Sequence, residues 1–103
     1  MPVRIARYSF VAFVRTLAGQ QLETGTQHRR FTVQVTAGGL AIVPDSSGQP
    51  RSESWAQLDG VLAEFALNGS LQPKDYQQLT RNASYLLRLI TLYQEHRSLL
   101  PTQ

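Results

Sequence analysis

Residues 29–43 read RRFTVQVTAGGLAIV, and this stretch decides the fold. Apolar and polar residues alternate in its first half, which is typical of a half-buried β-strand. Ala37-Gly38-Gly39 predicts a turn, because glycine tolerates the positive φ that tight turns need. Leu40–Val43 then returns as the partner strand. The residues expected on the buried face of the first strand are Phe31, Val33 and Val35. The sequence therefore predicts a β-hairpin over residues 29–43.

The chain before the hairpin predicts a helix over residues 4–18, RIARYSFVAFVRTLA, which ends near Gly19. A strand is the competing interpretation, but the alternation is poor. Gln20–Thr24 is expected to form a short strand with Leu22 facing inward, followed by a turn over 25–28. The apolar arc of the helix comprises Ala6, Phe10, Phe13, Val14 and Leu17. Arg4, Arg7 and Arg15 fall on an adjacent arc, with Val11 among them.

The chain after the hairpin predicts a loop over 44–50 and then three helices. Ser54 and Gln57 have the spacing of a capping box, so a helix begins at Trp55 and ends at Asn68-Gly69. A short helix is expected over Pro73–Thr80, and a last helix over Tyr85–Arg97 with Ser84 as its cap. The core stripe of the first of these helices is Trp55, Leu58, Val61, Leu62 and Phe65.

These elements predict one α+β domain over residues 1–103. It has an N-terminal helix, a three-stranded antiparallel sheet and three further helices. The short helix, the break at Arg81-Asn82-Ala83 and the last helix have the size of a helix-turn-helix.

Composition excludes several classes of chemistry. The chain has no cysteine, which removes disulfides, thiolate metal sites and cysteine nucleophiles. His28 and His96 are far apart in sequence, so no metal site and no cofactor is expected. No run approaches the roughly 20 apolar residues of a membrane span. Arg15 interrupts the apolar run near the N-terminus, so this run is interpreted as structure, and the expected location is the cytoplasm.

The 103 residues include ten basic and seven acidic side chains, and nine of the ten basic residues are arginine. Residues 1–51 hold six arginines against Glu23 and Asp45, whereas residues 52–103 hold four basic and five acidic side chains. Arginine pairs with phosphate through a bidentate fork and stacks on bases. A GC-rich coding bias is the alternative explanation of the arginine excess.

Catalysis has little support in the sequence, and the protein is expected not to be an enzyme. The carboxylates are scattered, and their spacing implies no acid–base pair that converges on a pocket. Ser46-Ser47-Gly48 lacks the glycines and the lysine of a phosphate-binding loop, so a plain turn explains it.

An arginine-rich surface that binds DNA or RNA is the leading functional hypothesis, because affinity for nucleic acid depends on neutralising phosphates. Asn82 and Tyr85 would lie at the start of the last helix, where base edges are usually read. The structural alternative is a solvated basic rim, with Asn82 as a turn residue. The candidate binding residues are Arg4, Arg7, Arg15, His28, Arg29, Arg30, Arg81 and Arg88.

The last helix is apolar around most of its circumference, so it is expected to lie in the core or to cover a partner. This raises a second hypothesis, a protein-interaction module or adaptor that forms a homodimer. The Leu99-Leu100 tail would add to such a surface. The candidate interface residues are Tyr85, Leu89, Leu92 and Tyr93.

Four short motifs resemble a type of small domain found in mobile gene cassettes, in phages and near defence genes. The resemblance covers most of the chain from residue 17 onward. It implies a compact bacterial-type cytoplasmic domain and carries over no activity and no binding residue. The motifs are Leu17-x-Gly19-x-x-Leu22-x-Thr24, Phe31-x-Val33, Pro44-x-Ser46-Ser47-Gly48-x-x-Arg51 and Arg81-Asn82-x-Ser84-Tyr85.

Overall fold

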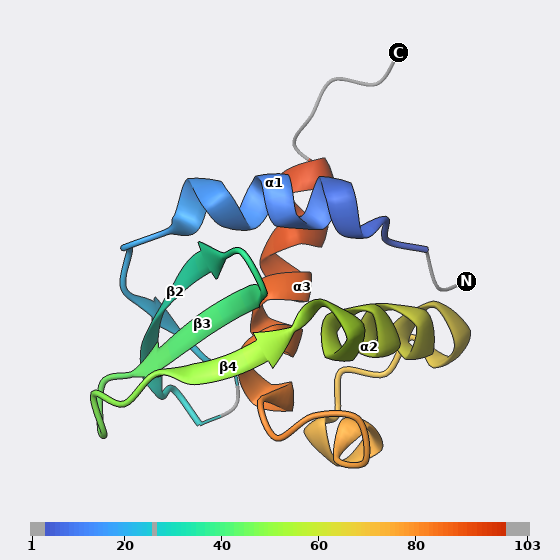
Figure 1. Cartoon of the computed structure of the whole chain (residues 1–103). Coiled ribbons are helices and arrows are strands. Elements are labelled where there is room, and N and C mark those ends of the chain that lie inside the picture. The colour runs from blue at the N-terminus through green and yellow to red at the C-terminus, as the bar shows by residue number, and fades with distance from the viewer. Residues whose placement is uncertain (1–3, 26, 99–103) are drawn as a thin grey trace.

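The computed structural model describes residues 4–25 and 27–98 of the chain. The expected contribution of Leu99 and Leu100 lies outside these residues. The fold is a mixed α+β arrangement in which helices pack against an antiparallel sheet (Figure 1). In chain order the elements are α1 (Arg7–Leu17), β1 (Leu22–Glu23), β2 (Arg30–Thr36), β3 (Gly39–Pro44), β4 (Arg51–Ser54), α2 (Trp55–Asn68), the 3-10 helix η1 (Pro73–Tyr76) and α3 (Ala83–Ser98).

The predicted hairpin is confirmed and forms the centre of the sheet. Strands β2 and β3 pair from Thr36 opposite Gly39 to Phe31 opposite Pro44, so the turn between them has two residues. Phe31 and Val33 are fully buried on the face predicted from the alternation. The sheet order is β1-β2-β3-β4, and every neighbouring pair is antiparallel.

Within residues 4–25 and 27–98 the sheet has four strands, and the expectation of three was wrong. The additional strand, β4, pairs with β3 from Gly39 opposite Ser54 to Ile42 opposite Arg51. Its sequence, RSES, has no apolar residue and therefore looks like a continuation of the preceding loop. Its inward residue is Glu53, which is only 1% exposed. The strand forms because backbone pairing with β3 does not require an apolar side chain.

Helix α2 follows the sequence prediction closely. The Ser54 side chain accepts a hydrogen bond from the backbone N–H of Gln57, and the Gln57 side chain accepts one from the backbone of Ser54. The helix ends at Gly69, which has a left-handed conformation with φ 64°. The stripe is buried at Leu58, Val61, Leu62 and Phe65, with Trp55 half-buried at its start.

The C-terminal part differs from the prediction in two places. The helix expected over Pro73–Thr80 is a single four-residue 3-10 turn, η1. Helix α3 begins at Ala83, so Ser84 lies inside the helix and is not its cap. The carbonyl of Asn82 accepts hydrogen bonds from the backbone N–H groups of Tyr85 and Leu86 in the first turn of α3. The segment therefore has only one full helix, because η1 is too short to act as the first helix of a helix-turn-helix.

Helix α3 is the central element of the core, which explains why most of its circumference up to Tyr93 is apolar. Figure 1 shows it running behind the sheet, with α1 crossing its upper part and α2 lying beside it. Its buried side chains join those of the sheet, α1, α2 and η1 in one cluster. Among the described residues, no helix is long and apolar enough to cross a membrane.

Candidate nucleic-acid interface

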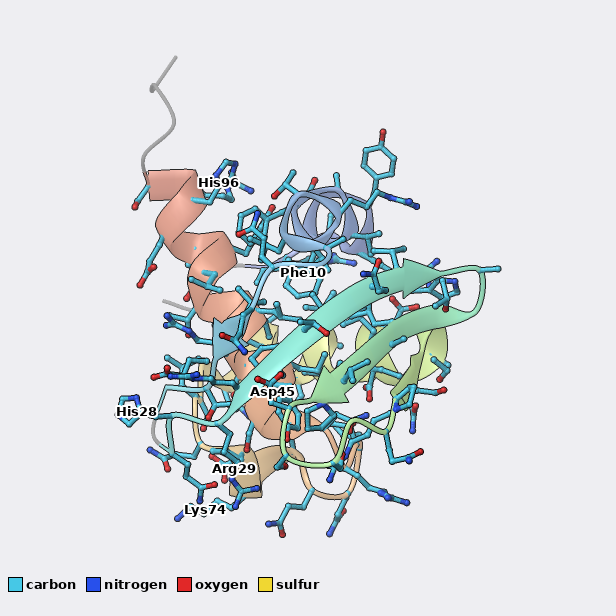
Figure 2. All side chains as sticks on the ribbon, turned by 90° about the vertical axis from the view of Figure 1, so that its left-hand side faces the viewer. Phe10, His28, Arg29, Asp45, Lys74 and His96 are labelled. Carbon is cyan, nitrogen blue, oxygen red and sulfur yellow. The ribbon has the colours of Figure 1, made fainter. Side chains whose placement is uncertain are left out.

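The eight basic residues singled out by the sequence do not form one surface. In Figure 1, helix α1 lies above the sheet, whereas the start of β2 lies at its lower end. Figure 2 confirms the separation from a second side, with His28 and Arg29 at the lower end and α1 at the top. Arg4, Arg7 and Arg15 therefore form one group, at the α1 end. Arg29, Arg81 and Arg88 belong to the opposite end. The single arginine-rich surface predicted from the sequence is therefore divided into two groups.

At the α1 end, part of the positive charge is already neutralised. Arg7 Nη1 lies 3.2 Å from Asp59 Oδ2, and its guanidinium lies 5.4 Å from the centre of the Trp55 ring. Arg15 and the 86%-exposed Tyr8 lie along the same shallow hollow of about 510 Å³. Two helical predictions were wrong here. Ala6 is exposed, and Val11 is buried although it was placed among the arginines, because the helix turns its buried face toward α3 and the sheet.

His28 and Arg30 share one acidic neighbour, Glu23 of β1. His28 Nδ1 lies 2.9 Å from Glu23 Oε1, and Arg30 Nε lies 4.0 Å from Glu23 Oε2. His28 has a φ of 54°, so the chain turns sharply just before β2. Arg29, between them, is exposed, and no carboxylate of the described residues lies within 4.0 Å of it. Of the three basic residues at the start of the hairpin, His28, Arg29 and Arg30, Arg29 is therefore the one whose charge is not paired with a described carboxylate.

Five cationic side chains lie toward the end of the molecule where α3 begins, and we call this set the basic end. The three salt bridges within the described chain leave all five without a carboxylate partner. Figure 2 shows Arg29 and Lys74 together at the lower end of the molecule. The residues of the basic end are Arg29, Arg51, Lys74, Arg81 and Arg88.

One side of the basic end is built by β4 and the start of α3. The Arg51 guanidinium lies 5.7 Å from the centre of the Tyr85 ring, which fixes its position over the first turn of α3. Arg51 and Arg81 line the same hollow of about 340 Å³ together with Asn82. Two arginines from distant parts of the sequence therefore lie along one opening.

The other side of the basic end is a second hollow, of about 320 Å³, in which Arg88 takes part. Arg29 adjoins this hollow, because its backbone N–H donates to Thr24 Oγ1 at 3.0 Å and Thr24 lines the wall. Lys74 follows directly after Pro73, another lining residue, but its own side chain lines a separate hollow with Glu64 and Asp75. The described residues that line the hollow beside Arg88 are Thr24, Gly25, Gln27, Leu71, Gln72, Pro73, Ser84, Leu87, Arg88 and Thr91.

A buried polar network fixes the start of α3 to the sheet. Glu53 Oε1 accepts hydrogen bonds from Thr80 Oγ1 at 2.6 Å and from Asn82 Nδ2 at 2.9 Å. Asn82 Nδ2 also lies 3.3 Å from the carbonyl oxygen of Ser52. This corrects the prediction that Asn82 reads base edges, because its amide is buried in this network. The network instead holds the backbone of Arg51 and Arg81 in place.

The predicted interface on α3 is also corrected. Tyr85 is 5% exposed, Tyr93 is 4% exposed, and Leu89 is fully buried. Tyr85 packs edge-on against Phe31, with 5.0 Å between the ring centres. Leu92 is half-buried. Because three of the four residues belong to the core, α3 has no outward apolar face of this composition. Homodimer formation itself stays a prediction, which sedimentation at several concentrations tests.

Sequence reasoning missed Arg51 and Lys74 as members of the basic end. Arg51 followed a polar loop, and its position over Tyr85 depends on β4, which was not predicted. Lys74 was part of the short segment considered for a helix-turn-helix but carried no motif of its own. In the part of the chain that the structure describes, no three histidine, cysteine or acidic residues gather as metal ligands would. Comparison with family models, curated proteins and solved structures found no match to this chain.

Proposed function

We propose that this protein is a small non-enzymatic nucleic-acid-binding protein, and that the DNA or RNA strand contacts the basic end. The observation that carries the proposal is the gathering of Arg29, Arg51 and Arg81 with Lys74 and Arg88 around one end of α3, without carboxylate partners in the described chain. Charged side chains that are not paired within the protein are free to neutralise phosphates.

The type of cation supports a phosphate backbone as the ligand. Four of the five residues are arginine, whose planar fork matches two phosphate oxygens at once. Their side chains come from different segments, and the Glu53 network and the Tyr85 ring fix two of these segments. A preorganised set of cations loses less conformational entropy on binding than a flexible one. The helix N-terminus adds the partial positive charge of its backbone N–H groups.

The proposed contacts are with the sugar-phosphate backbone of the nucleic acid, so the same contacts are available with DNA and with RNA. Phosphate contacts position a protein on a strand and carry no base sequence. The side chains that could have read bases, Asn82 and Tyr85, are buried. We therefore expect binding that depends strongly on salt and weakly on sequence.

The test is a filter-binding titration against duplex and single-stranded oligonucleotides at two ionic strengths. Each phosphate contact lowers the logarithm of the affinity by about 0.9 per decade of salt on duplex DNA, and by about 0.7 on a single strand. Arg51→Gln combined with Arg81→Gln should weaken binding and reduce this slope by about two contacts. Arg29→Ala with Arg30→Ala should act in the same direction.

The matched control is Arg4→Gln with Arg15→Gln, which removes the same charge from the α1 end. It should leave the affinity and the salt slope nearly unchanged. Equal losses in both double variants would mean that net charge alone drives binding, and the basic end would then be the wrong surface. Absence of salt-dependent binding by the unaltered protein would contradict nucleic-acid binding altogether.

A further inference from the structure

Arg88 is the one member of the basic end with a solvent-excluded nitrogen that lacks a partner in the described chain. Its side chain is half-buried on the second turn of α3, and its Nε is buried without a hydrogen-bond acceptor among the described residues. No described carboxylate lies within 4.0 Å of the guanidinium. A guanidinium stays charged at any physiological pH, so the group cannot be relieved by losing a proton. The guanidinium therefore keeps unused donor capacity, and the hollow that Arg88 lines is where an acceptor could meet its other nitrogens.

The hollow beside Arg88 has the size and lining for a small anion. Its volume is about 320 Å³, at the lower end of the range of about 300–1,000 Å³ for ligand sites. Ser84 lies one helical turn before Arg88, so both side chains are on the same face of α3. Gln72 and Thr24 add polar groups from two other segments, and none of the described lining residues is an aspartate or a glutamate. A hollow with a cation and hydroxyl groups but no carboxylate favours anions.

We propose that this hollow is a pocket for a single phosphate group, with Arg88 as its principal ligand. The guanidinium fork matches two oxygens of a phosphate, and Ser84 supplies a hydroxyl donor from the same helix face. The backbone of Arg29 adjoins the hollow through Thr24, and Figure 2 shows Arg29 at the same lower end of the molecule as Lys74. Leu71 and Leu87 form an apolar part of the wall, against which the organic group of a phosphate ester packs. This inference goes beyond strand binding, because it requires only one phosphate.

The direct test is an NMR titration of ¹⁵N-labelled protein with inorganic phosphate, with ionic strength held constant by replacing sodium chloride. The side-chain Nε–H signal of Arg88 should shift and saturate. Arg88→Gln should lower the phosphate affinity at least tenfold, and Arg88→Lys should lower it as well, because the charge remains but the fork is lost. Arg97→Gln is the matched control, since Arg97 lies in the last turn of the same helix, and it should leave the affinity unchanged.

Ser84→Glu separates loss of binding from loss of fold. A glutamate in the first turn of α3 stabilises the helix, because its negative charge is attracted to the partial positive charge at the helix N-terminus. The same carboxylate lies four residues before Arg88 and competes with phosphate for the guanidinium. The variant should therefore keep its unfolding temperature, or raise it, while phosphate binding falls at least tenfold. Unchanged phosphate affinity in both Ser84→Glu and Arg88→Gln would overturn the proposal.

Two oligonucleotides identify the source of the phosphate. A strand with a 5′-phosphate that displaces inorganic phosphate at least tenfold better than the same strand with a 5′-hydroxyl would support a pocket for strand ends. Equal competition by the two strands, with displacement by a nucleoside monophosphate, would support a pocket for free phosphate esters. If the protein binds no oligonucleotide but Arg88 still responds to inorganic phosphate, the strand-binding proposal fails and the pocket stands. If only Arg29 and Arg51 respond to phosphate, the pocket is wrong.

Discussion

At the scale of single residues, Gly39 shows how closely β3 and β4 approach. A Cβ atom at this position would lie 1.9 Å from the carbonyl oxygen of Glu53, and the residue has a φ of +153°. Gly39→Ala should therefore force the two strands apart and lower the free energy of unfolding by about 3 kcal/mol or more. Urea unfolding followed by far-UV circular dichroism measures the loss.

The neighbouring glycine provides the control. A Cβ atom at Gly38 would meet nothing within 4 Å, and this residue has no positive φ. Gly38→Ala should change the free energy of unfolding by less than about 0.5 kcal/mol, as is usual for an exposed position. A similar loss in both variants would mean that the turn, and not the approach of β4, determines the effect.

The buried phenol of Tyr76 should make the free energy of unfolding fall at alkaline pH. Burial raises the pKa of its phenol above the ordinary value of 10.0, and the nearby charges of Glu64 and Asp75 raise it further. In the unfolded chain the phenol ionises near pH 10, whereas the folded state still holds the proton. The stabilising contribution is therefore complete below pH 10 and is lost as the pH rises toward the folded pKa.

The variant Tyr76→Phe tests this dependence. It removes the hydrogen bond from the Tyr76 hydroxyl to the carbonyl of Ser70, which is 2.7 Å long, and should cost about 1 kcal/mol at pH 7. Its free energy of unfolding should fall less steeply between pH 9 and pH 11 than that of the unaltered protein. Tyr8→Phe, at an exposed phenol, is the matched control. Parallel pH profiles for the unaltered protein and Tyr76→Phe would rule out Tyr76 as the source.

Individual polar residues were the least predictable part of the sequence. No sequence pattern indicates that Glu53 and Asn82 are buried, since carboxylate and amide side chains are usually exposed. Their burial follows from β4, which brings Glu53 inward opposite Leu40, and from the chain returning over 80–82 to meet it. A partner 29 residues away cannot be deduced from spacing alone. The role of Asn82 as an anchor therefore became visible only in the structure.

At the scale of elements, predictability depended on local signals. The hairpin was predicted because alternation and a glycine turn occur in one continuous stretch, and α2 because its capping box and its glycine end are both local. Strand β4 and helix η1 lack such signals. The first depends on pairing with β3 over a loop, and the second has the proline of a helix start but stops after one turn.

Helix α2 contains a glycine that its structure does not require. Gly60 lies in the helix interior, and a Cβ atom there would lie 3.9 Å from Leu79 Cδ2, an ordinary contact distance. Gly60→Ala should stabilise the protein by about 0.5–1 kcal/mol, because glycine loses more backbone entropy in a helix than alanine. Thermal and urea unfolding measure the gain.

The reciprocal change in the same helix is the control. Ala63 is exposed on α2, and Ala63→Gly should destabilise by about 1 kcal/mol. A lower free energy of unfolding in Gly60→Ala would contradict this prediction. It would show that the side chain of Leu79 leaves too little space for a methyl group at position 60.

At the scale of the whole molecule, we expect one cooperative unfolding transition. The buried residues of the sheet, α1, α2, η1 and α3 form a single cluster. Trp55, the only tryptophan, donates from Nε1 to the carbonyl of Ala37 at 2.8 Å and carries Arg7 over its ring. Its fluorescence therefore reports contacts among α1, α2 and the β2–β3 turn. Fluorescence and far-UV circular dichroism should give the same urea midpoint, and separate midpoints would contradict a single cooperative unit.

The arrangement of charge over the molecule could not be predicted from the sequence. The excess of arginine in residues 1–51 indicated one basic surface, yet α1 and the base of β2 lie at opposite ends of the sheet (Figure 1). The basic end draws Lys74, Arg81 and Arg88 from the half of the chain whose net charge is negative. Net charge is a property of sequence, whereas a surface depends on which segments the topology brings together.

The unequal lengths of the strands affect how the protein behaves when many copies crowd together. The two inner strands have seven and six residues, whereas β1 at one border has two and β4 at the other has four. Unsatisfied backbone groups at a sheet border invite another chain to add its own strand, and short borders are one way in which natural proteins discourage this. At high concentration the protein should therefore remain as separate folded units and should not convert into amyloid-like fibrils.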